Sequence, residues 1–173
     1  MPTLNMKEVA ARLDPSGVAI SIADATMDDM PLCYANDAFE RMTGYSGDQV
    51  LGRNCRFLQG SLENDVARAK MRDALTRGAA AQVVFQNMRA DGTVFSNLVV
   101  IEPLTDRDGD LVYVVGSQFE IDRDTPIAKV RERGNHLVRE MDKLLDLNER
   151  LRATSRQALA RSMAATVKLW LET

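Results

Sequence analysis

Three stretches in the first half of the chain carry apolar residues at the spacing of an amphipathic helix. Asn36 is a favourable residue to begin the second of them. In the third, Val66, Met71 and Leu75 are expected to share the buried side, and Gly78 ends the helix. The pattern therefore predicts short helices over residues 4–13, 38–43 and 63–76.

Runs rich in β-branched residues, separated by polar turns, predict strands. Turns that contain Gly92 and Gly109 join the last three strands into an antiparallel meander. Together with the short helices, these strands predict an α+β fold: a five-stranded antiparallel sheet with short helices on one face. The predicted strands cover residues 18–23, 32–35, 81–89, 94–104 and 110–121.

After Thr125 and Pro126 the strand pattern disappears, and apolar residues recur at alternating steps of three and four. This heptad-like pattern predicts a helical extension that pairs with a second helix, and Asn148 would set the register of such a dimer. The alternative, in which the extension packs on the chain's own sheet, stays open. Farther on the apolar set moves to another face, which favours two helices or one bent helix. The predicted seam consists of Ile127, Val130, Gly134, Leu137, Met141, Leu144, Asn148 and Leu151.

A length of 173 residues fits one domain with a modest appendage. The predicted parts are a helical cap over residues 1–16, one α+β domain over 17–123 and the helical extension over 124–173. With 45% apolar and 27% charged residues, the composition is that of a soluble globular protein. No apolar run approaches the roughly 20 residues of a membrane span, and the N-terminal residues lack a signal-peptide pattern. We therefore expect no membrane association and a cytoplasmic location.

Charge and cysteine content exclude several other classes. The net charge of -3 gives no footprint for nucleic acid. The charge is uneven, because residues 124–173 carry ten basic and seven acidic side chains while the preceding part is acidic, a division that fits a domain joined to an interaction segment. Two cysteines and one histidine are too few for a disulfide framework or a zinc site, so no metal is expected.

Residues 52–60 read Gly-Arg-Asn-Cys-Arg-Phe-Leu-Gln-Gly. This run resembles the signature of the light-oxygen-voltage (LOV) domains, a flavin-binding branch of the PAS superfamily. The resemblance spans about residues 18–121 and includes YANDAF before the signature and the NLVVIEP and GSQFEI strands after it. It implies the PAS/LOV fold and flavin mononucleotide (FMN) as a non-covalently held cofactor.

The resemblance also assigns roles to individual residues. Cys55 matches the photoactive cysteine that lies beside the flavin ring. Two guanidinium groups meet the flavin phosphate in the family, and a planar fork suits a phosphate. Two amides read the polar edge of the pyrimidine ring, because an amide supplies both a donor and an acceptor. The implied cofactor-binding residues are Asn54 and Gln59 along the ribityl chain and ring, Arg56 and Arg72 at the phosphate, Asn87 and Asn97 at the pyrimidine edge, and Gln118 near N5 and O4.

The resemblance implies a blue-light photoreceptor rather than an enzyme. In the family, blue light drives a reversible bond between the cysteine sulfur and flavin C4a and protonates N5. Gln118 would then reorient and change the packing of the flanking helices or the dimer. We expect a homodimer through the helical extensions, with a separate signalling protein as a possible partner. A flavin-based redox sensor and a non-enzymatic PAS dimerisation module are the alternatives.

A second, shorter resemblance lies in the extension. Residues 137–142 resemble the start of the dimerisation helix in the HWE group of histidine kinases. In those kinases the phosphorylated histidine follows directly, whereas this chain has Lys143 at that position, and lysine cannot form a phosphohistidine. Whether the extension derives from such a helix is left open by the sequence.

Overall fold

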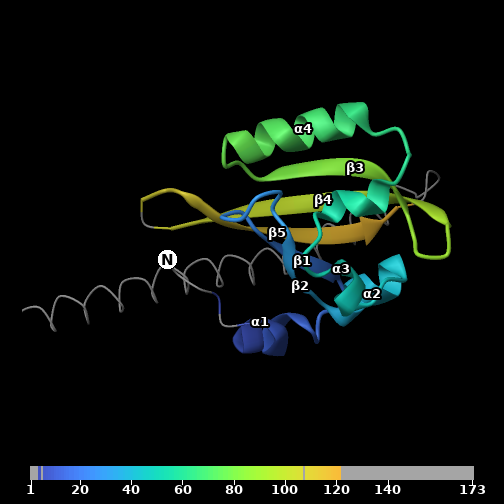
Figure 1. Ribbon diagram of the computed structural model, residues 1–173, viewed down its shortest axis with the longest axis horizontal. Helices are drawn as coiled ribbons and strands as arrows, with labels where there is room; N and C mark the ends of the chain where they lie inside the picture. Colours follow the sequence, from blue (N-terminus) through green and yellow to red (C-terminus); the bar gives the residue numbers. More distant parts are fainter. Residues whose placement is uncertain (1–3, 5, 107, 122–173) are drawn as a thin grey trace, which may run out of the picture.

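The computed structural model describes residues 4, 6–106 and 108–121 (Figure 1). Over these residues the chain forms short helices and one sheet, as the apolar pattern predicted. The element η1 is a 3-10 helix. In chain order the elements are α1 (Met6–Leu13), β1 (Ala19–Asp24), β2 (Leu32–Ala35), α2 (Asp37–Thr43), α3 (Gly47–Val50), η1 (Cys55–Gln59), α4 (Asp65–Thr76), β3 (Ala81–Met88), β4 (Val94–Thr105) and β5 (Leu111–Glu120).

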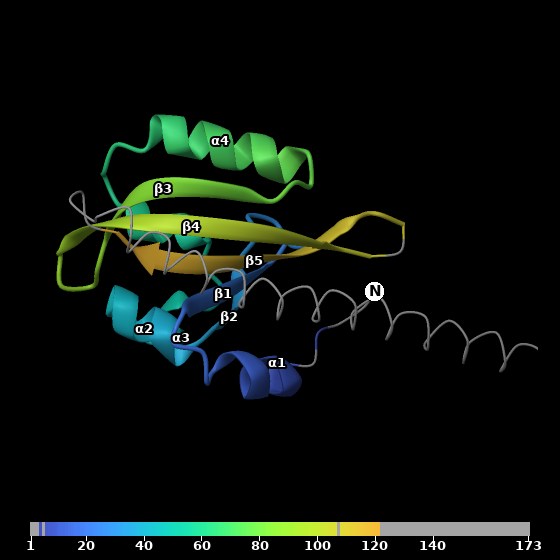
Figure 2. The same cartoon turned by 180° about the vertical axis from the view of Figure 1, so that it is seen from behind.

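The five strands form one antiparallel sheet in the order β2-β1-β5-β4-β3. The β3–β4 and β4–β5 turns contain Gly92 and Gly109 at φ values of 86° and 90°, a conformation that glycine adopts without strain. The last strand in sequence therefore lies at the centre, between β1 and β4 (Figure 2). The predicted α+β fold, a five-stranded antiparallel sheet with short helices, is confirmed.

One face of the sheet is covered by α1. Val9 and Leu13 of this helix pack with Ile20 and Ile22 of β1 and Val115 of β5. Successive residues of a strand point to opposite faces, so the odd-numbered positions of β1 face the other side.

The remaining helices cover that other face. Phe39, Val50 and Leu58, from α2, α3 and η1, form one buried cluster. Ala74 of α4 packs with Ile101 of β4 in a second cluster, and α4 runs alongside β3 (Figures 1 and 2). The helices α2, α3, η1 and α4 thus share one face, as predicted, whereas α1 lies on the opposite face. Of these helices, η1 and α4 border the cavity described below.

Asn36 begins α2 and fixes it to the sheet. Its side chain is completely buried. The Oδ1 atom accepts hydrogen bonds from the backbone N–H of Phe39 at 3.0 Å and of Ile20 at 2.9 Å. Its Nδ2 atom donates to the carbonyl oxygens of Leu13 and Val18. One amide therefore caps the helix and joins it to β1 and to the end of α1, which explains why this position needs Asn.

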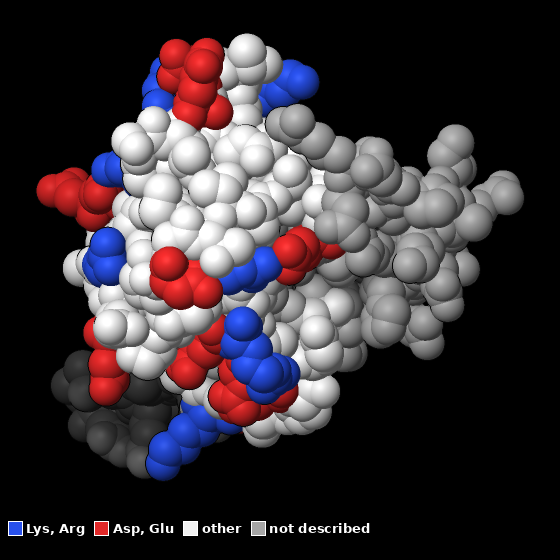
Figure 3. Space-filling view, turned by 90° about the vertical axis from the view of Figure 1, so that its right-hand side faces the viewer, with Lys and Arg blue, Asp and Glu red and all other residues white. Residues whose placement is uncertain are grey.

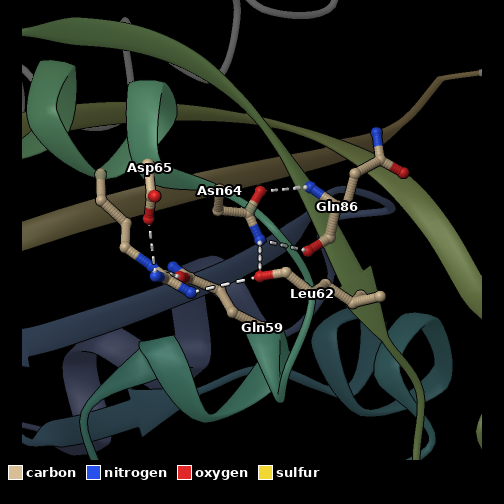
Figure 4. Close-up of polar contacts among 6 residues, drawn as sticks. Gln59, Leu62, Asn64, Asp65 and Gln86 are labelled. Atoms are coloured by element: carbon tan, nitrogen blue, oxygen red, sulfur yellow. Dashed lines mark hydrogen bonds and ion pairs between the residues drawn. The ribbon is translucent and has the colours of Figure 1, made fainter.

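Helix α4 corrects one prediction about its buried side. Val66 is 72% exposed instead of facing the sheet with Met71 and Leu75. The five residues from 66 to 71 correspond to about 140° around a helix, so the two side chains point in different directions. The helix also begins at Asp65 rather than at residue 63. The reason is that Asn64 bonds to the backbone of Gln86, accepting from its N–H at 2.8 Å and donating to its carbonyl at 2.9 Å (Figure 4).

Charged side chains of both signs lie close together on the face seen in Figure 3. Exposed ion pairs join Arg77 to Asp73 and Arg68 to Asp65 along α4. Pairs of this kind contribute at most about 1 kcal/mol each. The fold therefore depends mainly on the apolar clusters. The predicted helical extension over residues 124–173, with its seam, lies outside the described residues.

Candidate functional site

A cavity of about 640 Å³ lies between the sheet and the helices. Its lining comes from all five strands, from η1 and α4, and from the loop after β1. The structure brings all eight residues that the sequence predicted into this one lining. They are Asn54, Cys55, Arg56, Gln59, Arg72, Asn87, Asn97 and Gln118.

Cys55 is the first residue of η1. The preceding Asn54 caps this helix, because its Oδ1 atom accepts a hydrogen bond of 3.0 Å from the backbone N–H of Arg56. Gly60 ends the helix at a positive φ of 50°. The local sequence therefore fixes the position of the cysteine at the wall of the cavity.

The thiol of Cys55 is held in its neutral form. Burial raises its pKa from 9.0 to about 12, because a thiolate would lose its hydration. A reactive cysteine of the usual kind has a lowered pKa instead. Cys33, whose pKa burial raises to about 11, lies in β2 and is not among the residues that line the cavity. Only Cys55 combines a protonated thiol with access to the cavity, among the described cysteines.

Two asparagines from neighbouring strands form a pair in the wall. Asn97 on β4 donates from Nδ2 to Oδ1 of Asn87 on β3 at 2.9 Å. Asn87 in turn donates from Nδ2 to the carbonyl of Gln86 at 3.2 Å. Among the described residues, Oδ1 of Asn97 is buried without a hydrogen-bond partner. A buried acceptor of this kind is costly unless a ligand donates to it.

Gln118 contacts a residue that the sequence reasoning missed. Its Nε2 atom donates to Oγ of Ser21 on β1 at 2.9 Å, and both residues line the cavity. Its Oε1 atom is buried and has no partner within the described part of the chain. A signal for Ser21 was present, since it is the polar residue inside the buried run Val-Ala-Ile-Ser-Ile, and a buried hydroxyl needs a partner.

Three arginines contribute to the lining. Arg56 pairs with Asp29 on the loop after β1, at an exposed position. Arg72 and Arg68 both come from α4, four residues apart and so on one side of the helix. The sequence reasoning missed Arg68, although this spacing could have indicated it. Arg56 and Arg72 are exposed, whereas Arg68 is half-buried.

Arg68 also orients a predicted site residue. Its Nε atom donates to Oε1 of Gln59 at 2.7 Å, and one of its terminal nitrogens donates to the carbonyl of Leu62 at 3.2 Å (Figure 4). Its other terminal nitrogen lies 3.2 Å from Oδ1 of Asp65. Gln59 is therefore held by a side chain of α4, with its amide nitrogen left for another contact.

The chemistry of this lining fits a flavin that carries a phosphate group. Apolar side chains such as Phe85, Val99 and Leu75 suit a flat ring system. The unpartnered amide oxygens of Asn97 and Gln118 suit a ring edge that carries N–H groups. The guanidinium groups suit a phosphate. Within the described residues there is no group of three or more acidic, His or Cys side chains that could hold a metal ion, and no helix there has the length and apolar character needed to cross a membrane.

Comparison with known proteins agrees with this fold. Residues 15–123 match the family model of the PAS domain, and the chain belongs to that family. Within it, the chain belongs to the LOV proteins. The crystal structure of the Rhodobacter sphaeroides LOV protein is 40% identical in sequence, with a TM-score of 0.75, and the match covers 95% of both chains.

Curated relatives share only part of their length with this chain. The blue-light-activated histidine kinase 2 of Erythrobacter litoralis is 41% identical in an alignment of 142 residues that covers 76% of this chain and 40% of the relative. The blue-light photoreceptor of Listeria monocytogenes is 39% identical over 109 residues, which are 63% of this chain and 43% of the relative. The chain thus spans less than half the length of these two relatives.

Proposed function

We propose that this chain is a blue-light photoreceptor that binds FMN in the cavity and uses Cys55 as its photoactive residue. The observation that carries the proposal is the position of Cys55: a thiol kept protonated by burial, in the wall of a cavity whose other polar groups suit a flavin. The names of the relatives from Erythrobacter and Listeria, both blue-light proteins, support the same function.

What bound FMN supplies is the absorption of blue light and a C4a–N5 bond that becomes reactive in the excited state. Cys55 would supply the sulfur that bonds to C4a and the proton that N5 takes up, so the addition would need no external oxidant or reductant. In the dark the reverse elimination would restore the thiol. Because nothing is released, we propose that the chain is not an enzyme.

The other lining residues bind and orient the cofactor in this proposal. Arg56 and Arg72 hold the phosphate, and Arg56 would exchange its exposed partner Asp29 for that phosphate. Asn87 and Asn97 receive the pyrimidine edge, with the free Oδ1 of Asn97 as acceptor for a ring N–H. Asn54 and Gln59 complete the binding of the ribityl chain and ring.

Gln118 connects the cavity to the rest of the chain. When N5 gains a proton it changes from acceptor to donor, and an amide must then present its oxygen instead of its nitrogen. A misplaced buried hydrogen bond costs about 1–3 kcal/mol, comparable to typical coupling energies between sites. Gln118 is close to the end of β5 at Glu120. We propose that this change reaches the segment after residue 123. There it alters the packing of that segment, the arrangement of a homodimer, or the contact with a separate signalling partner in the cytoplasm.

The test is reversible bleaching of the FMN-loaded full chain under blue light. Cys55→Ala should keep its FMN and lose the reversible bleaching, whereas Cys33→Ala should bleach and recover like the wild type. The same two variants distinguish a photoreceptor from a flavin-based redox sensor. In a redox sensor, Cys55→Ala would leave the response to redox conditions intact. Reversible bleaching in Cys55→Ala would overturn the proposal.

A further inference from the structure

Ser21 and Gln118 form a buried polar pair in the wall of the cavity. The hydrogen bond from Nε2 of Gln118 to Oγ of Ser21 is 2.9 Å long, and the two residues are 3% and 4% exposed. They come from adjacent strands, since Ser21 lies opposite Gly116 in the β1–β5 ladder. A Cβ atom at Gly116 would lie 2.9 Å from Nε2 of Gln118, so the glycine leaves the space in which this bond forms.

The chemistry of a hydroxyl makes this contact reversible in direction. A serine hydroxyl can donate one hydrogen bond and accept two, and it rotates to suit its partner. Ser21 accepts from Nε2 in the orientation that the structure shows. If the amide turned over, the same hydroxyl could donate to Oε1. An aliphatic residue at position 21 could serve neither orientation.

The orientation in the structure leaves Oε1 of Gln118 as the free group, buried and without a partner among the described residues. A free acceptor is what a protonated ring nitrogen requires, while an unprotonated one requires the amide N–H. The amide orientation seen in the structure, with Nε2 bonded to Ser21 and Oε1 free, is therefore the one that matches the state after Cys55 has reacted.

We propose that Ser21 is a positioning residue that acts through Gln118 and stabilises the light-state orientation of its amide. This inference rests on the proposed function. Removing the hydroxyl leaves a buried amide N–H without its partner in that orientation, and an orphaned N–H is less tolerated than an under-satisfied carbonyl oxygen. Ser21→Ala should therefore speed dark recovery by roughly two- to tenfold, the effect of one ordinary hydrogen bond on a rate.

The test uses the FMN-loaded full chain and four variants. Ser21→Ala is compared with Ser21→Thr, which keeps a hydroxyl and should recover at the wild-type rate. Alanine and serine at position 21 are then compared in chains that also carry Gln118→Leu. If Ser21 acts through the amide, Ser21→Ala should change the rate in the first background and leave it unchanged in the second. An equal change in both backgrounds, or no change in the first, would overturn the proposal.

A second readout does not depend on photochemistry. The side-chain amide resonances of Gln118, observed in the dark in ¹⁵N-labelled protein, should shift in Ser21→Ala and stay near the wild-type position in Ser21→Thr. Unshifted resonances in Ser21→Ala would contradict the contact itself. A wild-type chain that does not bleach would overturn the proposed function and the kinetic role of Ser21, and these resonances would still show whether the two side chains are bonded.

Discussion

Asn97 and Asn87 are joined by a hydrogen bond of 2.9 Å from Nδ2 of the first to Oδ1 of the second. The two residues lie on the adjacent strands β4 and β3, and both line the cavity. The bond fixes the orientation of the Asn97 amide, so its buried Oδ1 is the group that remains for a ligand. This pair therefore selects a ligand edge that donates a hydrogen bond, which agrees with the N–H group of a flavin pyrimidine ring.

The first prediction concerns this acceptor. Asn97→Leu should weaken FMN binding by about ten- to a hundredfold, because the ring N–H would be buried without an acceptor. Flavin fluorescence during titration of the protein gives the dissociation constant. Gln86→Leu is the matched control, since the Gln86 side chain bonds to Ser96 and does not line the cavity. Equal affinity of Asn97→Leu and the control would contradict the assignment.

The second prediction concerns the phosphate. Arg72→Gln should weaken FMN binding about tenfold or more, because a charge-assisted contact to the phosphate is lost. The affinity for riboflavin, which has no phosphate, should stay unchanged. Arg77→Gln is the matched control. Arg77 directly follows α4 and pairs with Asp73, and neither residue lines the cavity. A parallel loss of riboflavin affinity in Arg72→Gln would place its role elsewhere than at the phosphate.

The third prediction follows from the raised pKa of Cys55. A thiol with a pKa of 9.0 would be half ionised at pH 9, whereas at a pKa of about 12 only about one in a thousand is ionised there. The yield of bleaching per absorbed photon should therefore be constant from about pH 6 to about pH 9.

The raised pKa of Cys55 also makes the stability of the fold depend on pH. Because the folded-state pKa lies above the unfolded one, the protonated thiol favours the folded state below about pH 9, and this contribution is lost as the pH rises toward 12.

A bleaching yield that follows a titration curve centred near pH 9 or below would show that the Cys55 thiolate forms in the neutral range and would contradict this part of the account.

The apolar pattern of the sequence was sufficient for the fold. The predicted strands differ from the observed ones by at most one residue at each end, because alternation and turn glycines define an antiparallel meander well. Val66 was placed on the wrong side of α4, since apolar character alone does not give the angle around a helix. The start of α4 was missed by two residues because the contact of Asn64 with Gln86 is made between distant parts of the chain.

The site could be predicted as far as the resemblance to a family reached. The eight residues that it supplied lie in one cavity. Ser21 and Arg68 were missed because their importance depends on the partners that the fold brings to them, Gln118 across the sheet and Gln59 from η1. A serine in a strand and an arginine on a helix are otherwise ordinary residues.

The fourth prediction concerns the response of the whole chain. Size-exclusion chromatography of the full-length protein in darkness and under blue light should give different elution volumes, since the proposed change at Gln118 lies near the end of β5. Cys55→Ala should elute at the dark-state volume under both conditions. Identical volumes for the wild type would contradict the proposed change in helix packing or dimerisation and would favour a response through a separate partner.

The visible absorption spectrum of the purified full-length chain with bound FMN, recorded before, during and after blue illumination, tests the central claim most directly. The account predicts that the flavin bands disappear in the light and return in darkness, because the Cys55 sulfur bonds to the ring and leaves it again. Unchanged absorption under strong illumination, with FMN still bound, would contradict it.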